Sequence, residues 1–422
     1  MIPSYCGTSI TQTHQLHLPI QPERLKSSFQ QGTMGTIAIN NQIVHDKIIF
    51  DSSLNVEIPL SLEKGINHFT ITYTEGRQIL IEEIEIYYLE NPDAIVDKED
   101  PKAFQTVQSA IDSIEKKEQS GTIFIRNGFY YEKNRIQGED ISIFGESSTQ
   151  TILSYDDFSA KVIGENGERC GTFRSPTFTI TNTAIGCQMM NLTIENTYDR
   201  YNRPGIESYE ERIAQGTYDI NDGYGCQAVA LRVDADQCSF RNLILQSGQD
   251  TLFDNIGRHY FYHCKIAGDV DFIFGEAQSV YEKCDIISRD IYSLPKGYIV
   301  APRTNINFEF GYLLLQCRLL HTIEKPFDTV YLARPWRQDG AVMFKDCYMD
   351  QHIKAQGYID MPSGSFYSFA EKARFYEYGS YGPGALTSEM RKIAPIDVVN
   401  RYTKENVLSS NGGQYLDDWK PF

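Results

Sequence analysis

The chain has 422 residues, of which 41% are hydrophobic and 12% aromatic, so it holds enough apolar side chains for a large core and is not a disordered polymer. No apolar run approaches the ~18 residues that a membrane-spanning helix needs, and we therefore expect no membrane association. The formal net charge is −17 and Lys and Arg form no cluster, which argues against a nucleic-acid partner. At roughly 150 residues per domain, the length predicts two or three domains unless part of the chain is repetitive.

The first residues carry no basic segment followed by an apolar stretch, so no secretory signal is visible. We therefore predict a cytoplasmic protein with reduced thiols, and secretion is the alternative. The nine cysteines include no CxxC pair, and the eight histidines show no ligand spacing. These patterns predict that the protein uses no metal and no cofactor.

Polar and apolar residues alternate with a period of two over residues 33–90, with breaks typical of turns at Asn40-Asn41 and Glu75-Gly76. This pattern predicts a small antiparallel β-sandwich, which we assign to an accessory domain over residues 1–95. The acidic stretch 93–100 is predicted to be a linker.

A single helix is predicted next, over Pro101–Lys116, where apolar residues recur every three or four positions behind a proline. From Gly121 onward the helical pattern gives way to short β-branched runs for the greater part of the chain. A continuous β region of this length is typical of a solenoid. The predicted helix is expected to cover the open edge of the first coil of the solenoid.

The solenoid is supported by an internal repeat. The segment Phe240–Phe253 overlays Phe261–Phe274, with Phe, Asp and Phe at the same offsets and the two copies 21 residues apart. This predicts an all-β fold, a right-handed parallel β-helix over residues 96–422, with coils stacked about 4.8 Å apart. Five cysteines recur at comparable intervals and are predicted to be buried packing positions; they are Cys238, Cys264, Cys284, Cys317 and Cys347.

The same spacing gathers four polar residues. Gln227 and Gln249 are 22 residues apart, and Asp250 precedes Asp271 by 21, so all four are predicted to lie on one face of three adjacent coils. Both aspartates stand in apolar runs, where burial disfavours a charged carboxylate. A polar ladder of this kind can equally satisfy backbone groups at the turns of a β-helix, and spacing alone leaves the two interpretations open.

Four segments in this region resemble the signature segments of pectin methylesterases (pectinesterases), in that family's order. They are Gln227–Leu231, Gly248–Phe253, Gly268–Gly275 and Leu332–Trp336. The likeness covers roughly residues 100–422 and extends to three further segments: Phe104–Ile111, Phe375–Gly384 and Trp419–Pro421.

The resemblance implies a parallel β-helix that hydrolyses the C6 methyl ester of galacturonic acid in homogalacturonan or its oligomers and releases methanol. By position, Asp271 resembles the nucleophile that forms an acyl-enzyme, and Asp250 the general acid that later acts as a base. Arg334 is expected to favour the ionised form of Asp271. Gln227 and Gln249 are expected to donate hydrogen bonds to the oxyanion.

The same resemblance predicts substrate contacts. Trp336 is expected to stack on a sugar ring, and Phe253 and Phe274 are expected to line the cleft. Many relatives have a tryptophan where this chain has Gln356–Met361, and Tyr358 is predicted to substitute for it. Taken singly, an aromatic residue of this kind is more easily explained as part of the core, although Trp336, which follows Arg-Pro, is less easily explained in that way.

Two further features depart from the family pattern. Asp269 adds a third carboxylate two residues before Asp271, where it is expected to influence a neighbouring acid. An insertion over residues 199–224 is expected to reshape one end of the cleft. Because the chain is strongly acidic, we also hypothesise short or highly esterified substrates, which carry little negative charge.

Two alternative functions stay open at this stage. One is another pectin-active β-helix enzyme, a polygalacturonase or a lyase. The other is a non-catalytic carbohydrate-binding protein that keeps the cleft.

Overall fold

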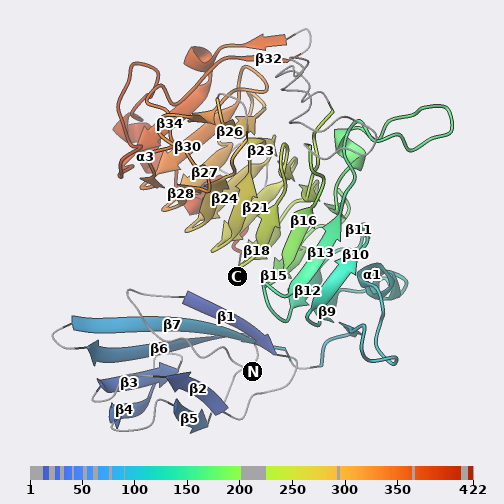
Figure 1. The fold of residues 1–422 in the computed structure, drawn as a ribbon, viewed down its shortest axis with the longest axis vertical. Helices are drawn as coiled ribbons and strands as arrows, with labels where there is room; N and C mark the ends of the chain where they lie inside the picture. The colour runs from blue at the N-terminus through green and yellow to red at the C-terminus, as the bar shows by residue number, and fades with distance from the viewer. Residues whose placement is uncertain are drawn as a thin grey trace.

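The computed structural model places most of the chain in a stack of β-strand coils (Figure 1). Within the N-terminal part it describes seven strands, chiefly for their backbone. Beyond them it describes residues 89, 91–200, 225–291, 295–363, 366–409 and 417–421.

Three parallel sheets run along the stack. Successive coils supply the neighbouring strands of each sheet. The ten-strand sheet contains β8 (Ala94–Val96), β9 (Gly121–Ile125), β12 (Ile141–Gly145), β15 (Gln188–Met190), β18 (Cys238–Arg241), β21 (Arg258–Tyr262), β24 (Gln278–Glu282), β27 (Tyr312–Leu315), β30 (Ala341–Lys345) and β34 (Arg374–Tyr378). The eight-strand sheet contains β10 (Gly128–Tyr131), β13 (Thr151–Tyr155), β16 (Thr193–Asn196), β19 (Ile244–Gln246), β22 (Lys265–Gly268), β25 (Asp285–Ser288), β28 (Arg318–His321) and β31 (Tyr348–Met349). The seven-strand sheet contains β11 (Asn134–Ile136), β14 (Phe178–Ile180), β17 (Leu231–Val233), β20 (Leu252–Asp254), β23 (Val270–Gly275), β26 (Gly297–Pro302) and β29 (Val330–Ala333).

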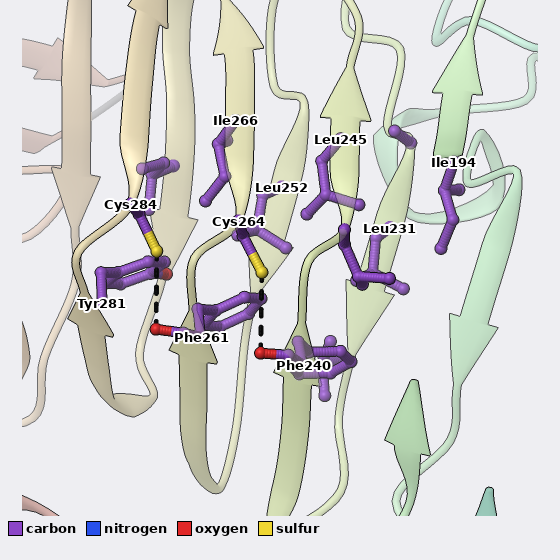
Figure 2. Close-up of a cluster of buried hydrophobic side chains, with 14 of the residues drawn as sticks. Ile194, Leu231, Phe240, Leu245, Leu252, Phe261, Cys264, Ile266, Tyr281 and Cys284 are labelled. Atoms are coloured by element: carbon purple, nitrogen blue, oxygen red, sulfur yellow. Dashed lines mark hydrogen bonds between the residues drawn. The ribbon is translucent and has the colours of Figure 1, made fainter. Parts of the chain in front are cut away.

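The core lies inside the coils because alternate residues of every strand point inward. Figure 2 shows equivalent side chains of successive coils in rows, with Phe240, Phe261 and Tyr281 forming one of them. Their rings stack with centroids 4.5 Å and 4.7 Å apart. Phe240 pairs with Phe261, and Phe253 with Phe274. The predicted parallel β-helix and its 21-residue repeat are confirmed.

The five repeated cysteines are buried in this core, as predicted. The Sγ of Cys264 lies 3.6 Å from the carbonyl oxygen of Phe240, and that of Cys284 lies 3.5 Å from that of Phe261 (Figure 2). Each thiol therefore donates a weak hydrogen bond to the preceding coil while it fills a small inward position.

Helix α1 (Val107–Glu115) covers the first coils, where it contacts β8, β9 and β11. Thr106 caps it by accepting a hydrogen bond from the Ser109 N–H at 3.2 Å. The predicted helix over Pro101–Lys116 is correct in kind but begins later, because Phe104 forms a β-bridge with Val96. The helix residues that face the core are Val107, Ala110, Ile111 and Ile114.

The stretch 93–100 is not only a linker, which corrects the sequence-based interpretation. Its residues Ala94–Val96 form β8, which pairs with β9 at the edge of the ten-strand sheet. Ala94 and Val96 are buried there, and their contribution to the core outweighs the acidic character of the flanking residues.

The N-terminal strands form a five-strand sheet in which β3, β4, β6 and β7 pair antiparallel, as expected, whereas β1 pairs parallel with β7. A parallel neighbour requires a long connection, and the intervening strands of the set supply it. The packing of these strands as a sandwich, and a domain boundary at residue 95, stay predictions. The strands are β1 (Thr13–Leu18), β3 (Thr33–Ile39), β4 (Gln42–Phe50), β6 (Gly65–Glu75) and β7 (Gln78–Tyr88), with β2 (Arg24–Ser28) and β5 (Asn55–Pro59) forming a separate pair.

The C-terminal segment covers the outer face of the ten-strand sheet. Helices α3 (Ile396–Arg401) and α4 (Lys404–Val407) bring Val399 and Val407 against Val280 and Leu313 in a second apolar cluster. A hairpin of β32 (Met361–Ser363) and β33 (Phe366–Ser368) and two short 3₁₀ helices, η1 (Thr172–Arg174) and η3 (Ala370–Lys372), complete the described elements. Among the helices in the ranges given above, none is long and apolar enough to cross a membrane.

Candidate active site

The candidate site lies on the seven-strand sheet, where coils containing the predicted residues are hydrogen-bonded to one another. The Ala228 N–H donates to the Gln249 carbonyl at 3.0 Å, and the Asp250 N–H donates to the Val270 carbonyl at 3.0 Å. Gln227, Gln249 with Asp250, and Asp271 therefore lie on three successive coils. Both glutamine side chains are half-buried.

Asp271 occupies an irregular point of β23. The pairing with β26 shifts register between Val270 and Ile273, and Asp271 has a φ of 51°. Asp250, one coil earlier, has a φ of 67°. A left-handed conformation is uncommon in residues other than glycine and concentrates at functional sites, as do β-bulges, which change the direction of a side chain.

Arg334 holds Asp271 through two parallel hydrogen bonds. Its Nε lies 2.7 Å from Oδ1 and its Nη2 lies 2.5 Å from Oδ2. Burial by itself lowers the pKa of Arg334, but the adjacent Asp271 carboxylate outweighs burial and raises it. This bidentate contact fixes the orientation of the Asp271 carboxyl group.

Tyr298 is a site residue that sequence reasoning missed. Its ring lies under Arg334, whose Cζ is 3.8 Å from the ring centroid, and it stacks on Tyr331 of the next coil at 5.7 Å. Burial raises the pKa of Tyr298. The position was hard to find because the coil that joins β23 to β26 is longer than 21 residues, so the repeat no longer marks equivalent positions.

Asp250 has the opposite environment to Asp271. Its side chain is buried, and burial, followed by the negative charge of Asp271, raises its pKa well above the ordinary value. The Arg334 charge opposes this effect only in part. The site therefore combines a carboxylate paired with a guanidinium and a neighbouring buried carboxyl whose pKa is raised.

The aromatic residues form a layered cluster on the outer face of the same sheet. Phe253 and Phe274 stack with centroids 4.5 Å apart, and Trp336 packs across them at 6.4 Å and 5.8 Å. The two phenylalanines are 1% and 4% exposed, so they support Trp336 from below instead of lining an open cleft as predicted. Trp336 is only partly buried and is the member that a ligand can reach.

Two cations lie near the indole of Trp336. The Cζ of Arg303 is 4.7 Å and that of Arg337 is 5.5 Å from the ring centroid. Such contacts fix the ring orientation and add positive charge beside it. This local charge is opposite in sign to the net charge of the chain.

The predicted sugar contact of Tyr358 is wrong. Tyr358 is 1% exposed and packs inside the solenoid, 5.2 Å from the ring of Phe375. The reason is local pairing: Tyr358 forms a bridge with Ala333 and thereby extends the seven-strand sheet with its side chain inward.

Asp269, the additional carboxylate, is buried and forms an ion pair with Arg200. Its Oδ1 also accepts a hydrogen bond from the Val270 N–H at 2.6 Å. Arg200 belongs to the predicted insertion, and sequence reasoning did not single it out. Residues 201–224 of that insertion lie outside the described residues.

The parts of the chain that the structure describes contain no group of three or more His, Cys, Asp or Glu residues arranged to hold a metal ion. The residues gathered at the site supply carboxyl, amide, guanidinium and aromatic groups. This set is suited to acyl transfer by a carboxylate nucleophile.

Known proteins show the same combination of fold and sequence. The family model described as Pectinesterase matches residues 220–414. Pectinesterase A of Dickeya dadantii is 31% identical over 355 residues, which cover 78% of this chain and 91% of that protein. Pectinesterase QRT1 of Arabidopsis thaliana is 32% identical over 299 residues, which cover 69% of this chain and 70% of that protein.

Solved structures agree. Pectin methylesterase PemA from Erwinia chrysanthemi has a TM-score of 0.68 and 29% identity, and the match covers 79% of this chain and 99% of that one. The pectin methylesterase from Yersinia enterocolitica has a TM-score of 0.63 and 26% identity, with 72% and 98% covered. The chain therefore belongs to the pectinesterase family, whose members are carboxylic ester hydrolases.

Proposed function

We propose that the protein hydrolyses methyl esters of galacturonic acid in homogalacturonan or its oligomers and releases methanol through an acyl-enzyme on Asp271. The observation that carries this proposal is the contrast between two carboxyl groups on successive coils. Asp271 is paired with Arg334, whereas Asp250 is buried with a strongly raised pKa. A nucleophile and a proton donor are needed in these two states at the same time.

In the first half-reaction, a carboxylate oxygen of Asp271 attacks the ester carbonyl carbon. The carbonyl electrons move to the oxygen, and the amides of Gln227 and Gln249 are the proposed donors to this oxyanion. When the tetrahedral intermediate collapses, the bond to the methoxy oxygen breaks and Asp250 transfers its proton to that oxygen. Methanol leaves, and an anhydride joins Asp271 to the sugar carboxyl group.

In the second half-reaction, the ionised Asp250 removes a proton from water, and the hydroxide attacks the sugar carbonyl of the anhydride. The anhydride bond breaks, which frees Asp271 as a carboxylate and the product as a galacturonic acid. The product then releases its carboxyl proton to the solvent and becomes a galacturonate. Asp250 again carries a proton, so the site returns to its starting state without an external acid.

The proposed binding surface is the exposed part of Trp336. A solved relative is described as a pectin methylesterase in complex with a hexasaccharide, which supports an oligosaccharide ligand for this chain. The charge of −17 favours short or highly esterified substrates, because a de-esterified polymer is a polyanion. Turnover on methylated trimers to hexamers, compared with polymeric pectin at physiological salt, tests this preference, and a strong preference for the polymer would refute it.

Replacing the nucleophile tests the mechanism. We expect Asp271→Asn to lower methanol release from methylated oligogalacturonides by at least about 10³-fold, because the amide cannot form the acyl-enzyme. Asparagine tolerates the left-handed backbone at this position, so the fold is expected to persist. The measurements are methanol release and far-UV circular dichroism.

The matched control is Asp346→Asn, since Asp346 also has a positive φ, of 55°, but lies between β30 and β31 outside the site. It should retain native activity. Full activity of Asp271→Asn would contradict the proposed role. New reducing ends or unsaturated products in place of methanol would instead indicate a polygalacturonase or a lyase.

A further inference from the structure

Asp269 and Arg200 form a buried ion pair at the edge of the candidate site. The side chain of Asp269 is 6% exposed and that of Arg200 is 15% exposed. The pair joins two distant parts of the chain, because Arg200 follows β16 and Asp269 lies between β22 and β23. Two charges removed from water in this way are strongly coupled to other charges nearby.

The pair lies beside the backbone that leads to Asp250. The Asp269 N–H donates to the Gly248 carbonyl at 3.2 Å. A side chain added at Gly248 would bring its Cβ 3.2 Å from Oδ2 of Asp269 and 3.3 Å from Nη2 of Arg200. Gly248 stands two residues before Asp250. Because it has no side chain, the ion pair can pack directly against its backbone.

Arg200 is held in place by the segment before it. The ring of Tyr198 stacks on Phe158 with centroids 4.0 Å apart, and the Tyr198 N–H donates to Oδ1 of Asn196. The Asn196 side chain donates to the Asp157 carbonyl at 2.8 Å. The guanidinium therefore approaches Asp269 from an anchored strand end.

The charged groups around Asp250 come from several coils. Asp271 and Asp269 favour its neutral form, whereas Arg334 and Arg200 favour its ionised form. Arg289, from the coil after Asp269, acts on Asp269 and also donates to the Ser247 carbonyl at 2.5 Å. Removal of a single member of this set changes the balance of charge at Asp250.

We propose that Arg200 and Asp269 are positioning residues whose ion pair balances the charge beside Asp250 and so sets the upper pH limit of catalysis. The proposal rests on the proposed role of Asp250 as general acid. Neither residue of the pair touches the reacting atoms in this scheme, and each acts through Asp250.

The test is the pH profile of kcat/KM for methanol release, whose alkaline limb reports loss of the proton from the acid. Asp269→Asn removes one negative charge but keeps an oxygen that can accept the Val270 N–H. The charge of Arg200 then acts on Asp250 without the opposing charge of Asp269, and the limb should move to lower pH by roughly one unit. The double variant Arg200→Gln/Asp269→Asn removes both charges and should return the limb towards its native position.

A general loss of stability would not produce this pattern. The control Glu377→Gln breaks another buried ion pair, with Arg391, which lies near the C-terminal coils, and should lower the melting temperature without moving the limb. If Asp269→Asn does not fold, Arg200→Lys should keep the native limb and Arg200→Gln should shift it. The proposal would be overturned if the alkaline limb did not move in folded Asp269→Asn or in Arg200→Gln. It would also be overturned if the limb of the double variant were displaced as far as that of Asp269→Asn.

The two proposals fail in different ways. A native protein that releases no methanol refutes the proposed function. A native protein that is active, with an alkaline limb insensitive to Asp269, refutes only the role of the ion pair.

Discussion

At the scale of single residues, the partner against which a group is buried decides its protonation. Burial and the adjacent Asp271 charge strongly raise the pKa of Asp250, whereas Arg334 keeps a fixed counter-charge on Asp271. A second buried acid, Asp254, accepts a hydrogen bond from Tyr281 at 2.5 Å and pairs with His259. The contacts of Asp271 with Arg334 and of Asp254 with Tyr281 join residues far apart along the chain, which the stacked coils bring together.

The His259 pairing predicts a pH-dependent stability. Burial by itself lowers the pKa of His259, but Asp254 and the Ala235 carbonyl together raise it above the ordinary 6.5. A raised pKa means that the stabilisation is complete below 6.5 and is lost as the pH rises through the folded value. The free energy of unfolding in urea, measured from about pH 5 to about pH 9, should therefore fall across this window.

The variant His259→Gln supplies the comparison. It lacks the titrating ring, so its stability should be lower at the acidic end of the range and should change less with pH. Parallel curves for the native protein and the variant would contradict the assignment.

At the scale of elements, the seven-strand sheet tolerates no added bulk where successive coils meet. Gly275, at the end of β23, has a φ of 135°, and a Cβ there would lie 2.0 Å from the Asp254 carbonyl oxygen. Close approach and a backbone region that other residues avoid both require glycine at this position. The glycine thus allows β23 to stack directly on β20.

The substitution Gly275→Ala tests this requirement. We expect it to cost about 3 kcal/mol in the free energy of unfolding, because both the clash and the backbone strain must be accommodated. Gly167→Ala is the matched control, since Gly167 has a φ of 75° but no described atom lies within 4 Å of the point where its Cβ would stand. Its cost should be about 1 kcal/mol, and equal costs for the two variants would show that contact between coils is not the cause.

At the scale of the whole molecule, the buried guanidinium of Arg258 binds the C-terminal segment to the outer face of the solenoid. Arg258 has no exposed side-chain surface, and it pairs with Asp236 and donates to the carbonyls of Leu408 and Asp417 at 3.2 Å and 3.0 Å. The same segment completes the second apolar cluster through Val407 and Leu408. Arg258 therefore connects the last described residues to the middle coils.

We expect Arg258→Ala to lower the free energy of unfolding by about 3 kcal/mol, because it leaves two carboxylates and two carbonyls without their buried donor. Limited proteolysis should then cut the chain near its C-terminal end. Arg318→Ala removes a solvent-exposed partner of Asp285 and should cost no more than about 1 kcal/mol. Comparable losses in the two variants would contradict the special role of Arg258.

Sequence patterns predicted the structure well where the coils have constant length. The 21-residue offset between Asp250 and Asp271 placed both on successive coils, and the cysteine interval marked inward positions. The patterns failed where a register shift or a longer coil intervened. Tyr298 was missed for this reason. Tyr358 was assigned to the substrate, although it forms a β-bridge with Ala333 and its side chain lies in the core.

The sequence by itself determined the parallel β-helix and the grouping of two aspartates with two glutamines, because stacking converts a regular spacing along the chain into neighbours in space. Only the tertiary structure decided which carboxyl group is paired with Arg334, which one is buried so that its pKa is raised, and that Arg200 reaches Asp269. These outcomes depend on how deeply each side chain is buried and on contacts between coils of unequal length. The spacing of residues along the chain predicts neither of them.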